Sequence, residues 1–113
     1  MKPIIIQNSK IPAYLSIFIS ISAISLFPFI ISRDEMSETT IRHECIHIEQ
    51  QRELWVIPFC LLYSFYWLRG KLSGMTNDEA YFNIPFEREA YAKMYDPNYL
   101  EKRDRFAWRQ YIN

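Results

Sequence analysis

Glycine and histidine are scarce in this chain of 113 residues, which contains two of each. Neither a glycine-rich phosphate loop nor a dinucleotide fingerprint occurs, and there is no G-x-S-x-G nucleophile elbow. The charged residues balance, with 13 basic and 13 acidic side chains, so no net field attracts nucleic acid. These absences argue against a P-loop enzyme, a serine hydrolase of the elbow type and a nucleic-acid-binding protein.

Only two cysteines are present, and they are too far apart to bond. Cys45 and Cys60 stand in a stretch that we expect to be helical, where 15 residues span about 22 Å. A disulfide between them is therefore not expected, which fits a reducing, cytoplasmic compartment. The length predicts a single domain over residues 1–113.

A charge-free stretch covers residues 11–32, between Lys10 and Arg33. It has the length of a bilayer-spanning segment. However, isoleucines and serines alternate imperfectly in its middle, between Pro12 and Pro28, which is typical of β-structure. We expect residues 1–33 to be β-rich, with a strand over residues 23–32, and a membrane-associated segment remains the alternative.

The remainder, residues 38–113, reads as helical. Ser37 or Thr39 can cap a helix that begins near residue 38 and runs to about Pro58, where the ring forces a kink or a stop. A second charge-free run, residues 54–68, predicts a buried helix, or alternatively an interfacial hairpin dipping into a membrane. A loop over residues 70–77, a helix from Pro85 and a final helix over 99–112 follow. The predicted class is α+β, mostly helical, with an N-terminal β-hairpin or strand beside the first helix.

Both histidines belong to the stretch HECIH, residues 43–47. Four residues apart on a helix, His43 and His47 lie about 40° from each other and can share one zinc ion. Glu44 lies about 100° round from His43, where its carboxylate can act as a base without being a ligand. The pattern H-E-x-x-H therefore predicts a Zn²⁺ site, whereas the alternative is two ordinary histidines on a helix.

A catalytic zinc site needs a third protein ligand, and the chain has no third histidine. Two carboxylates follow Pro85, at Glu87 and Glu89. On a helical wheel Glu87 falls on the apolar face, near Phe86 and Ala90, whereas Glu89 falls on the polar, solvated side. A charge on an apolar face needs a partner or a metal, so we predict Glu87 as the third ligand.

HECIH followed some forty residues later by FEREA resembles the gluzincin zinc metallopeptidases. Their third ligand is the glutamate of a helical E-x-x-A-D pattern, and membrane-associated CAAX-type peptidases share this arrangement. The resemblance implies a zincin-like domain, Zn²⁺ held by His43, His47 and Glu87, Glu44 as general base, and a peptide or protein substrate. The chain departs from the pattern at Tyr91, where the family has an aspartate that orients a ligand histidine. Most of the chain is also similar to a group of small uncharacterised bacterial and phage proteins.

Other roles are open at this stage. Gluzincins need a donor to the oxyanion, for which Tyr91 and Tyr81 are the candidates, and Gln51 can hydrogen-bond a ligand or a substrate carbonyl. The strand over residues 23–32 would bind extended substrate by strand addition. Two functions remain in competition: a zinc peptidase, and a non-catalytic protein in which zinc ties helices together beside an interaction or membrane surface.

Overall fold

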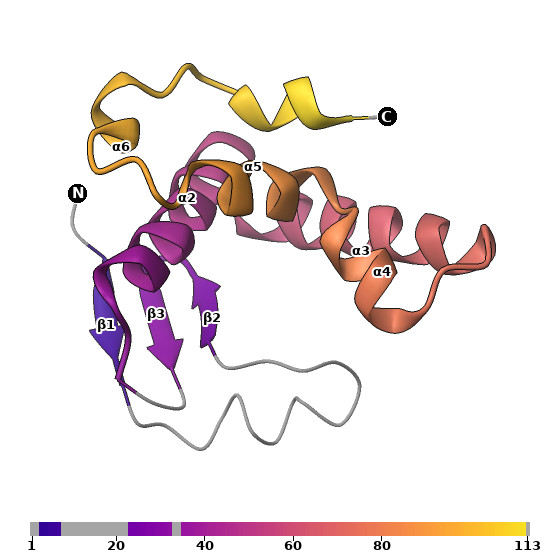
Figure 1. Ribbon diagram of the computed structural model, residues 1–113, viewed down its shortest axis with the longest axis horizontal. Helices are drawn as coiled ribbons and strands as arrows, with labels where there is room; N and C mark the ends of the chain where they lie inside the picture. The colour runs from indigo at the N-terminus through magenta and orange to yellow at the C-terminus, as the bar shows by residue number, and fades with distance from the viewer. Residues whose placement is uncertain (1–2, 8–22, 33–34, 113) are drawn as a thin grey trace.

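The computed structural model describes residues 3–7, 23–32 and 35–112, and its strands precede its helices (Figure 1). The elements are β1 (Ile4–Ile6), β2 (Ala23–Leu26), β3 (Phe29–Ser32), α2 (Glu38–Leu54), α3 (Val56–Leu72), α4 (Asn77–Phe82), α5 (Pro85–Lys93), α6 (Tyr99–Lys102) and the 3₁₀ helix η1 (Ala107–Tyr111). The predicted α+β class, mostly helical, is confirmed. Residues 8–22 lie outside the described residues, and so does most of the charge-free stretch.

The three strands form one small sheet in the order β1-β3-β2. β1 runs parallel to β3 and β2 runs antiparallel to it, and Ile30 on the central strand is completely buried. The predicted strand over residues 23–32 is therefore a hairpin. It lies against α2, as expected, because the Gln51 amide accepts from the Phe27 N–H and donates to the Ser25 carbonyl at 2.9 Å.

Helix α2 begins as predicted, since the Ser37 hydroxyl caps it by accepting from the Thr40 N–H at 3.2 Å. The prediction that it reaches Pro58 is wrong. It ends at Leu54 because Trp55 adopts a positive φ of 70°, which interrupts the helical hydrogen bonds. Pro58 lies in the first turn of α3, where its missing N–H leaves no hydrogen bond unmade.

The charge-free run over residues 54–68 is helical, but the prediction that it is buried is wrong. Only Phe59 and Gly70 of α3 are buried, and one whole face of the helix is exposed. A side chain at Gly70 would meet Ala80 at 3.0 Å, so glycine is what lets α4 approach α3. None of the helices in the described part of the chain is long and apolar enough to cross a bilayer.

The C-terminal tail was expected to be one helix and is two short ones, α6 and η1. The chain turns between them at Phe106, which has a positive φ of 56° and donates its N–H to Glu53 at the end of α2. η1 then lies along α5 (Figure 1) and places Trp108 against Phe86 in the main core. The tail therefore closes the core over α5.

Two apolar clusters hold the helices together. The larger has Phe59, Ile84, Phe86 and Trp108 at its centre. The smaller consists of Ile46, Ala90 and Tyr99 and lies where α2 meets α5. Ala90 is fully buried there, and its small side chain permits a close approach of the two helices. The pair α2 and α5 carries the functional residues.

Candidate metal centre

Helices α2 and α5 bring three predicted ligands to one point. The Nε2 atoms of His43 and His47 lie 3.2 Å apart. One oxygen of Glu87, Oε1, lies 3.0 Å from His43 Nε2 and 2.9 Å from His47 Nε2. The three side chains are almost completely buried. Two imidazole nitrogens and a carboxylate oxygen thus form a nearly equilateral triangle.

The size of this triangle can be compared with that of a zinc site. Zinc binds nitrogen and oxygen at about 2.0–2.2 Å, which places tetrahedral ligands about 3.3–3.6 Å from each other. The observed sides of 2.9–3.2 Å are shorter than the edges of that tetrahedron. The donor types therefore suit Zn²⁺, and the three side chains would have to move apart slightly to hold it.

Gln50 fixes the tautomer of His47. The amide nitrogen of Gln50 faces two groups that can only accept, the Phe86 carbonyl and a Glu89 oxygen, each at 3.0 Å. Its oxygen therefore faces His47 Nδ1, 2.7 Å away, so Nδ1 carries a proton. In neutral His47 the lone pair is then on Nε2, the atom in the triangle. Gln50 was not among the predicted site residues, although a residue three positions after a helical histidine is within reach of it.

His43 has no such support. Its Nδ1 is buried and has no hydrogen-bond partner among the described residues. Tyr91, at the position of the aspartate in the gluzincin pattern, instead packs edge-on against the His43 ring with the ring centroids 4.4 Å apart. Its hydroxyl lies 3.0 Å from that of Tyr81. The described residues therefore offer His43 Nδ1 no orienting acceptor of the kind that the family pattern supplies.

Tyr91, which packs against the His43 ring, is hydrogen-bonded to Tyr81. Burial raises the pKa of Tyr81, and the negative charge of Glu87 raises it further. Burial also raises the pKa of Tyr91. Both hydroxyls therefore keep their protons at neutral pH and can donate hydrogen bonds. The structure brings both predicted oxyanion donors together, and Tyr91 is partly exposed.

Tyr63 is a further partner of the ligands. Its hydroxyl donates to the second oxygen of Glu87, Oε2, at 2.7 Å, which leaves Oε1 to face the histidines. Burial and the charge of Glu87 raise the pKa of Tyr63, so it remains a donor. The sequence signal was a tyrosine in an apolar run, because a buried tyrosine hydroxyl usually finds a partner.

Glu44 lies beside the triangle without belonging to it. Its Oε2 is 3.9 Å from His43 Nε2, and its ligand atom lies within 4.8 Å of those of both histidines. Glu87 is closer to both rings, so of the two carboxylates Glu87 makes the direct contacts with the histidines and Glu44 flanks them. Burial raises the pKa of Glu44, against the opposing effect of the two histidines. A carboxylate with a raised pKa is a better base for a reaction near neutral pH.

Without metal, His47 and Glu87 have strongly shifted pKa values and carry opposite charges. Burial acts to lower the pKa of His47, but the carboxylate of Glu87 outweighs burial and raises it to about 9. Burial acts to raise the pKa of Glu87, but His47 and hydrogen bonds from both rings outweigh it and lower the pKa. The protein without metal therefore holds a His47–Glu87 ion pair at neutral pH.

The assignment of Glu89 to a solvated face is wrong, because this residue is completely buried. Its carboxylate accepts from Arg103, from the Tyr99 hydroxyl at 2.7 Å and from the Gln50 amide at 3.0 Å. Arg103 also pairs with Glu53 at 3.1 Å. The tail covers the side of α5 that the wheel left to solvent, and a buried charge is tolerated there because it is paired.

The predicted role of Gln51 is also wrong, since both ends of its amide bond the β2–β3 hairpin instead of a ligand.

Comparison of the chain with models of protein families, with curated proteins and with solved structures finds no match.

Proposed function

We propose that this protein is a zinc-dependent peptidase of the gluzincin type, with His43, His47 and Glu87 as ligands and Glu44 as general base. The observation that carries the proposal is the triangle of His43 Nε2, His47 Nε2 and Glu87 Oε1, with sides of 2.9–3.2 Å and the Glu44 carboxylate just outside it. Three ligands and a separate buried acid are the groups that metal-assisted peptide hydrolysis requires.

Each residue has a definable part in this mechanism. When bound, zinc would supply a Lewis acid that lowers the pKa of water towards neutrality. Glu44 takes the proton from the attacking water and passes it to the leaving amine. The paired hydroxyls of Tyr81 and Tyr91 donate to the oxygen that becomes negative when the carbonyl is attacked. Gln50 and Tyr63 keep His47 and Glu87 in place.

The β2–β3 hairpin supports a peptide as the substrate. It is tied to α2 through Gln51, and β2 is at the edge of the sheet formed by the described strands. An extended peptide can pair with such an edge and pass beside the motif helix.

The test compares Glu44→Gln with Glu49→Gln, a partly exposed acid on the same helix that pairs with Arg52. Both variants should keep one zinc per chain and a melting temperature close to the wild type. Against a mixed peptide library, Glu44→Gln should lose about a hundredfold to ten-thousandfold in rate, and Glu49→Gln should lose almost none. Undiminished cleavage by Glu44→Gln would refute the mechanism.

A structural zinc site is the competing proposal, and the burial of the site favours it. His43, His47 and Glu87 are each no more than 6 % exposed, and they join α2 to α5. Structural zinc has four protein ligands, whereas catalytic zinc leaves a position for water. Absorption spectra of the cobalt-substituted protein that shift when a small anion is added would support the open site, and zinc-loaded wild type that cleaves no peptide would support the structural one.

A further inference from the structure

The outward face of α3 carries an unbroken apolar stripe. Five large apolar side chains, between 52 % and 81 % exposed, make up this outer stripe: Ile57, Leu61, Phe65, Leu68 and Leu72. At about 100° per residue they occupy a sector only about 80° wide along the whole helix. The inward face of the same helix reaches the core through Phe59 and the metal centre through Tyr63. α3 therefore presents a second apolar face that no described residue covers.

The charges beside the outer stripe are all positive. Arg69 lies about 40° beyond one edge of the stripe and Lys71 about 40° beyond the other. Residues 54–77 contain no acidic side chain, although the chain as a whole is neutral. Neither cation forms an ion pair within the described part of the chain. An apolar sector bordered by cations on both sides is typical of a helix that lies in an anionic lipid interface.

Trp55, immediately before α3, is held in a costly conformation. Its φ of 70° and ψ of 157° fall in a region that essentially only glycine adopts without strain. Its side chain is 78 % exposed, so the indole adds little to the core in return. Strained residues of this kind cluster at functional sites, and tryptophan is one of the residues enriched at membrane–water interfaces.

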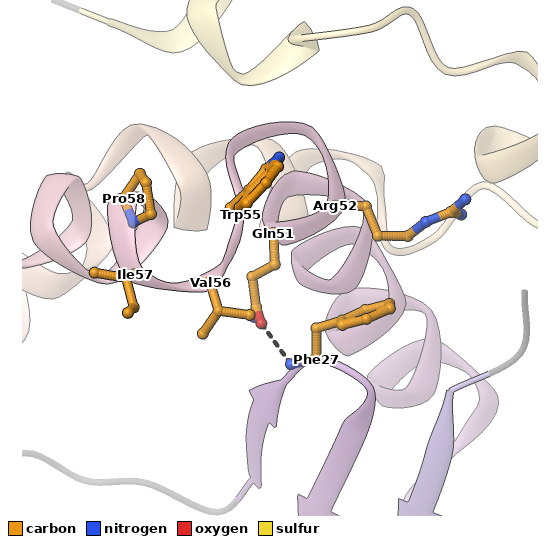
Figure 2. A pocket seen from close by; sticks show the side chains of 7 residues that line it. All are labelled: Phe27, Gln51, Arg52, Trp55, Val56, Ile57 and Pro58. Carbon is orange, nitrogen blue, oxygen red and sulfur yellow. Dashed lines mark hydrogen bonds between the residues drawn. The ribbon is translucent and has the colours of Figure 1, made fainter.

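An apolar pocket opens where the outer stripe begins (Figure 2). It has a volume of about 550 Å³ and lies between the β2–β3 turn and the junction of α2 with α3. Its apolar lining consists of Phe27, Trp55, Val56, Ile57 and Pro58. Ile57 belongs both to this pocket and to the outer stripe, so the two apolar surfaces are continuous. Arg52, which pairs with Glu49, lies at the edge of the pocket.

We propose that the outer stripe of α3 binds the surface of an anionic lipid bilayer. The helix lies parallel to the membrane, with the stripe against the acyl chains, Trp55 in the interface and Arg69 and Lys71 at the headgroup phosphates. A second copy that packs through the same face fits less well, because residues 54–77 offer its cations no acidic partner. The contact does not depend on zinc or on peptidase activity.

The test is co-sedimentation of the full chain, with and without zinc, with vesicles of phosphatidylcholine alone or mixed with phosphatidylglycerol. Wild type should bind the mixed vesicles, and added salt should weaken the binding. Leu61→Glu/Phe65→Glu should abolish it, because both changes place a charge in the stripe. Arg69→Gln/Lys71→Gln, which leaves apolar packing intact, should weaken it on the order of tenfold.

The matched control is Tyr95→Glu/Ile112→Glu, which changes two exposed apolar residues outside α3 and should bind like wild type. Melting curves check that each variant is folded. Failure of wild type to bind the mixed vesicles would overturn the proposal. Undiminished binding by Leu61→Glu/Phe65→Glu would also overturn it, since the lipid contact would then lie elsewhere in the chain. A wild-type dimer that the same variant dissociates, without vesicle binding, would assign the stripe to a second copy.

Discussion

The two histidines of the candidate metal centre stand on the same helix and face the same carboxylate, yet their surroundings differ. His47 is held through Gln50, which is itself fixed by Glu89 and, through it, by Arg103. His43 has a buried Nδ1 without a described partner and packs against the Tyr91 ring. One ligand is therefore oriented by hydrogen bonds and the other by aromatic packing.

The difference has an energetic meaning. To bind a metal through Nε2, a neutral histidine must carry its proton on Nδ1. Neutral His47 does so without leaving an N–H unpaired, because Gln50 accepts that proton. His43 would have to leave a buried N–H unpaired, which costs about 1–3 kcal/mol. His47 is thus oriented by a hydrogen bond, whereas His43 would have an unpaired N–H when it binds a metal.

Removal of Glu89, which holds Gln50 and through it His47, should have the largest effect on stability. Glu89→Ala leaves Arg103 buried without its main partner, and removing one member of a buried pair costs about 3–5 kcal/mol. We expect the melting temperature to fall by about 15 °C or more in thermal unfolding. Glu49→Ala, which removes a partly exposed pair with Arg52, should cost less than about 1 kcal/mol. Equal losses in the two variants would contradict the role of Glu89.

The second-largest effect should be a dependence of the free energy of unfolding on pH in the metal-free protein. The pKa of His47 is raised to about 9 in the folded protein from its usual 6.5. A raised pKa means that the folded state binds this proton more tightly, so its stabilisation is complete below pH 6.5 and is lost as the pH rises through 9. Denaturant unfolding should show a loss of no more than about 3 kcal/mol over that range.

His47→Gln supplies the control for this pH effect, since its unfolding free energy should lack the decline between pH 6.5 and 9. Glu87 acts in the opposite direction: its pKa is lowered, so its contribution is present above its usual pKa of 4.5 and is lost as the pH falls below that value. A wild-type stability that rises between pH 6.5 and 9 without metal would contradict the ion pair.

Removal of the hydrogen bond between Gln50 and His47 should have a smaller effect, on zinc affinity. Gln50→Leu leaves His47 Nδ1 without an acceptor, and loss of a group that orients a ligand typically lowers metal affinity about tenfold to a hundredfold. Zinc affinity can be measured by competition with a chelating dye. Gln51→Leu is the matched control, because it disturbs the hairpin contact while leaving the ligands alone. Similar zinc affinities for the two variants would remove Gln50 from the site.

The smallest expected effect is an increase in zinc affinity. Tyr91→Asp puts a carboxylate on the residue that packs against the His43 ring, whose Nδ1 has no described partner, and should strengthen zinc binding by about tenfold. Tyr91→Asn, which can also accept but carries no charge, should give a smaller gain in the same chelator competition. Weaker zinc binding by Tyr91→Asp would mean that the packing of the Tyr91 ring matters more than a hydrogen bond to His43.

Much of the centre was accessible from the sequence because helical periodicity is local. The spacing of His43 and His47 and the apolar face around Glu87 each need only one helix, and the three side chains do lie together. That they bind a metal stays a prediction. Glu89 failed the same reasoning because the residues that bury and pair it, Tyr99 and Arg103, come from the following segment. A helical wheel describes the faces of one helix and does not predict which other segments pack against them.

The same limit explains the errors in the fold. The end of α2 is set by a positive φ at Trp55, a conformation that its bulky side chain gives no reason to expect. α3 was predicted to be buried because residues 54–68 are apolar, but composition does not say how many faces of a helix find partners. Gln50 was overlooked in favour of Gln51, since both lie within one turn of His47 and only the direction of the ring separates them.

The third ligand comes from α5, and this has a consequence for the unfolded chain. His47 and Glu87 are 40 residues apart, so an ion that joined them would close a loop containing all of α3 and α4. By the relation used for disulfides, closing a loop of that length removes conformational entropy from the unfolded state worth about 4 kcal/mol. Zinc would then act as a reversible covalent-like cross-link, and a chelator would do to this fold what a reducing agent does to a disulfide-bonded one.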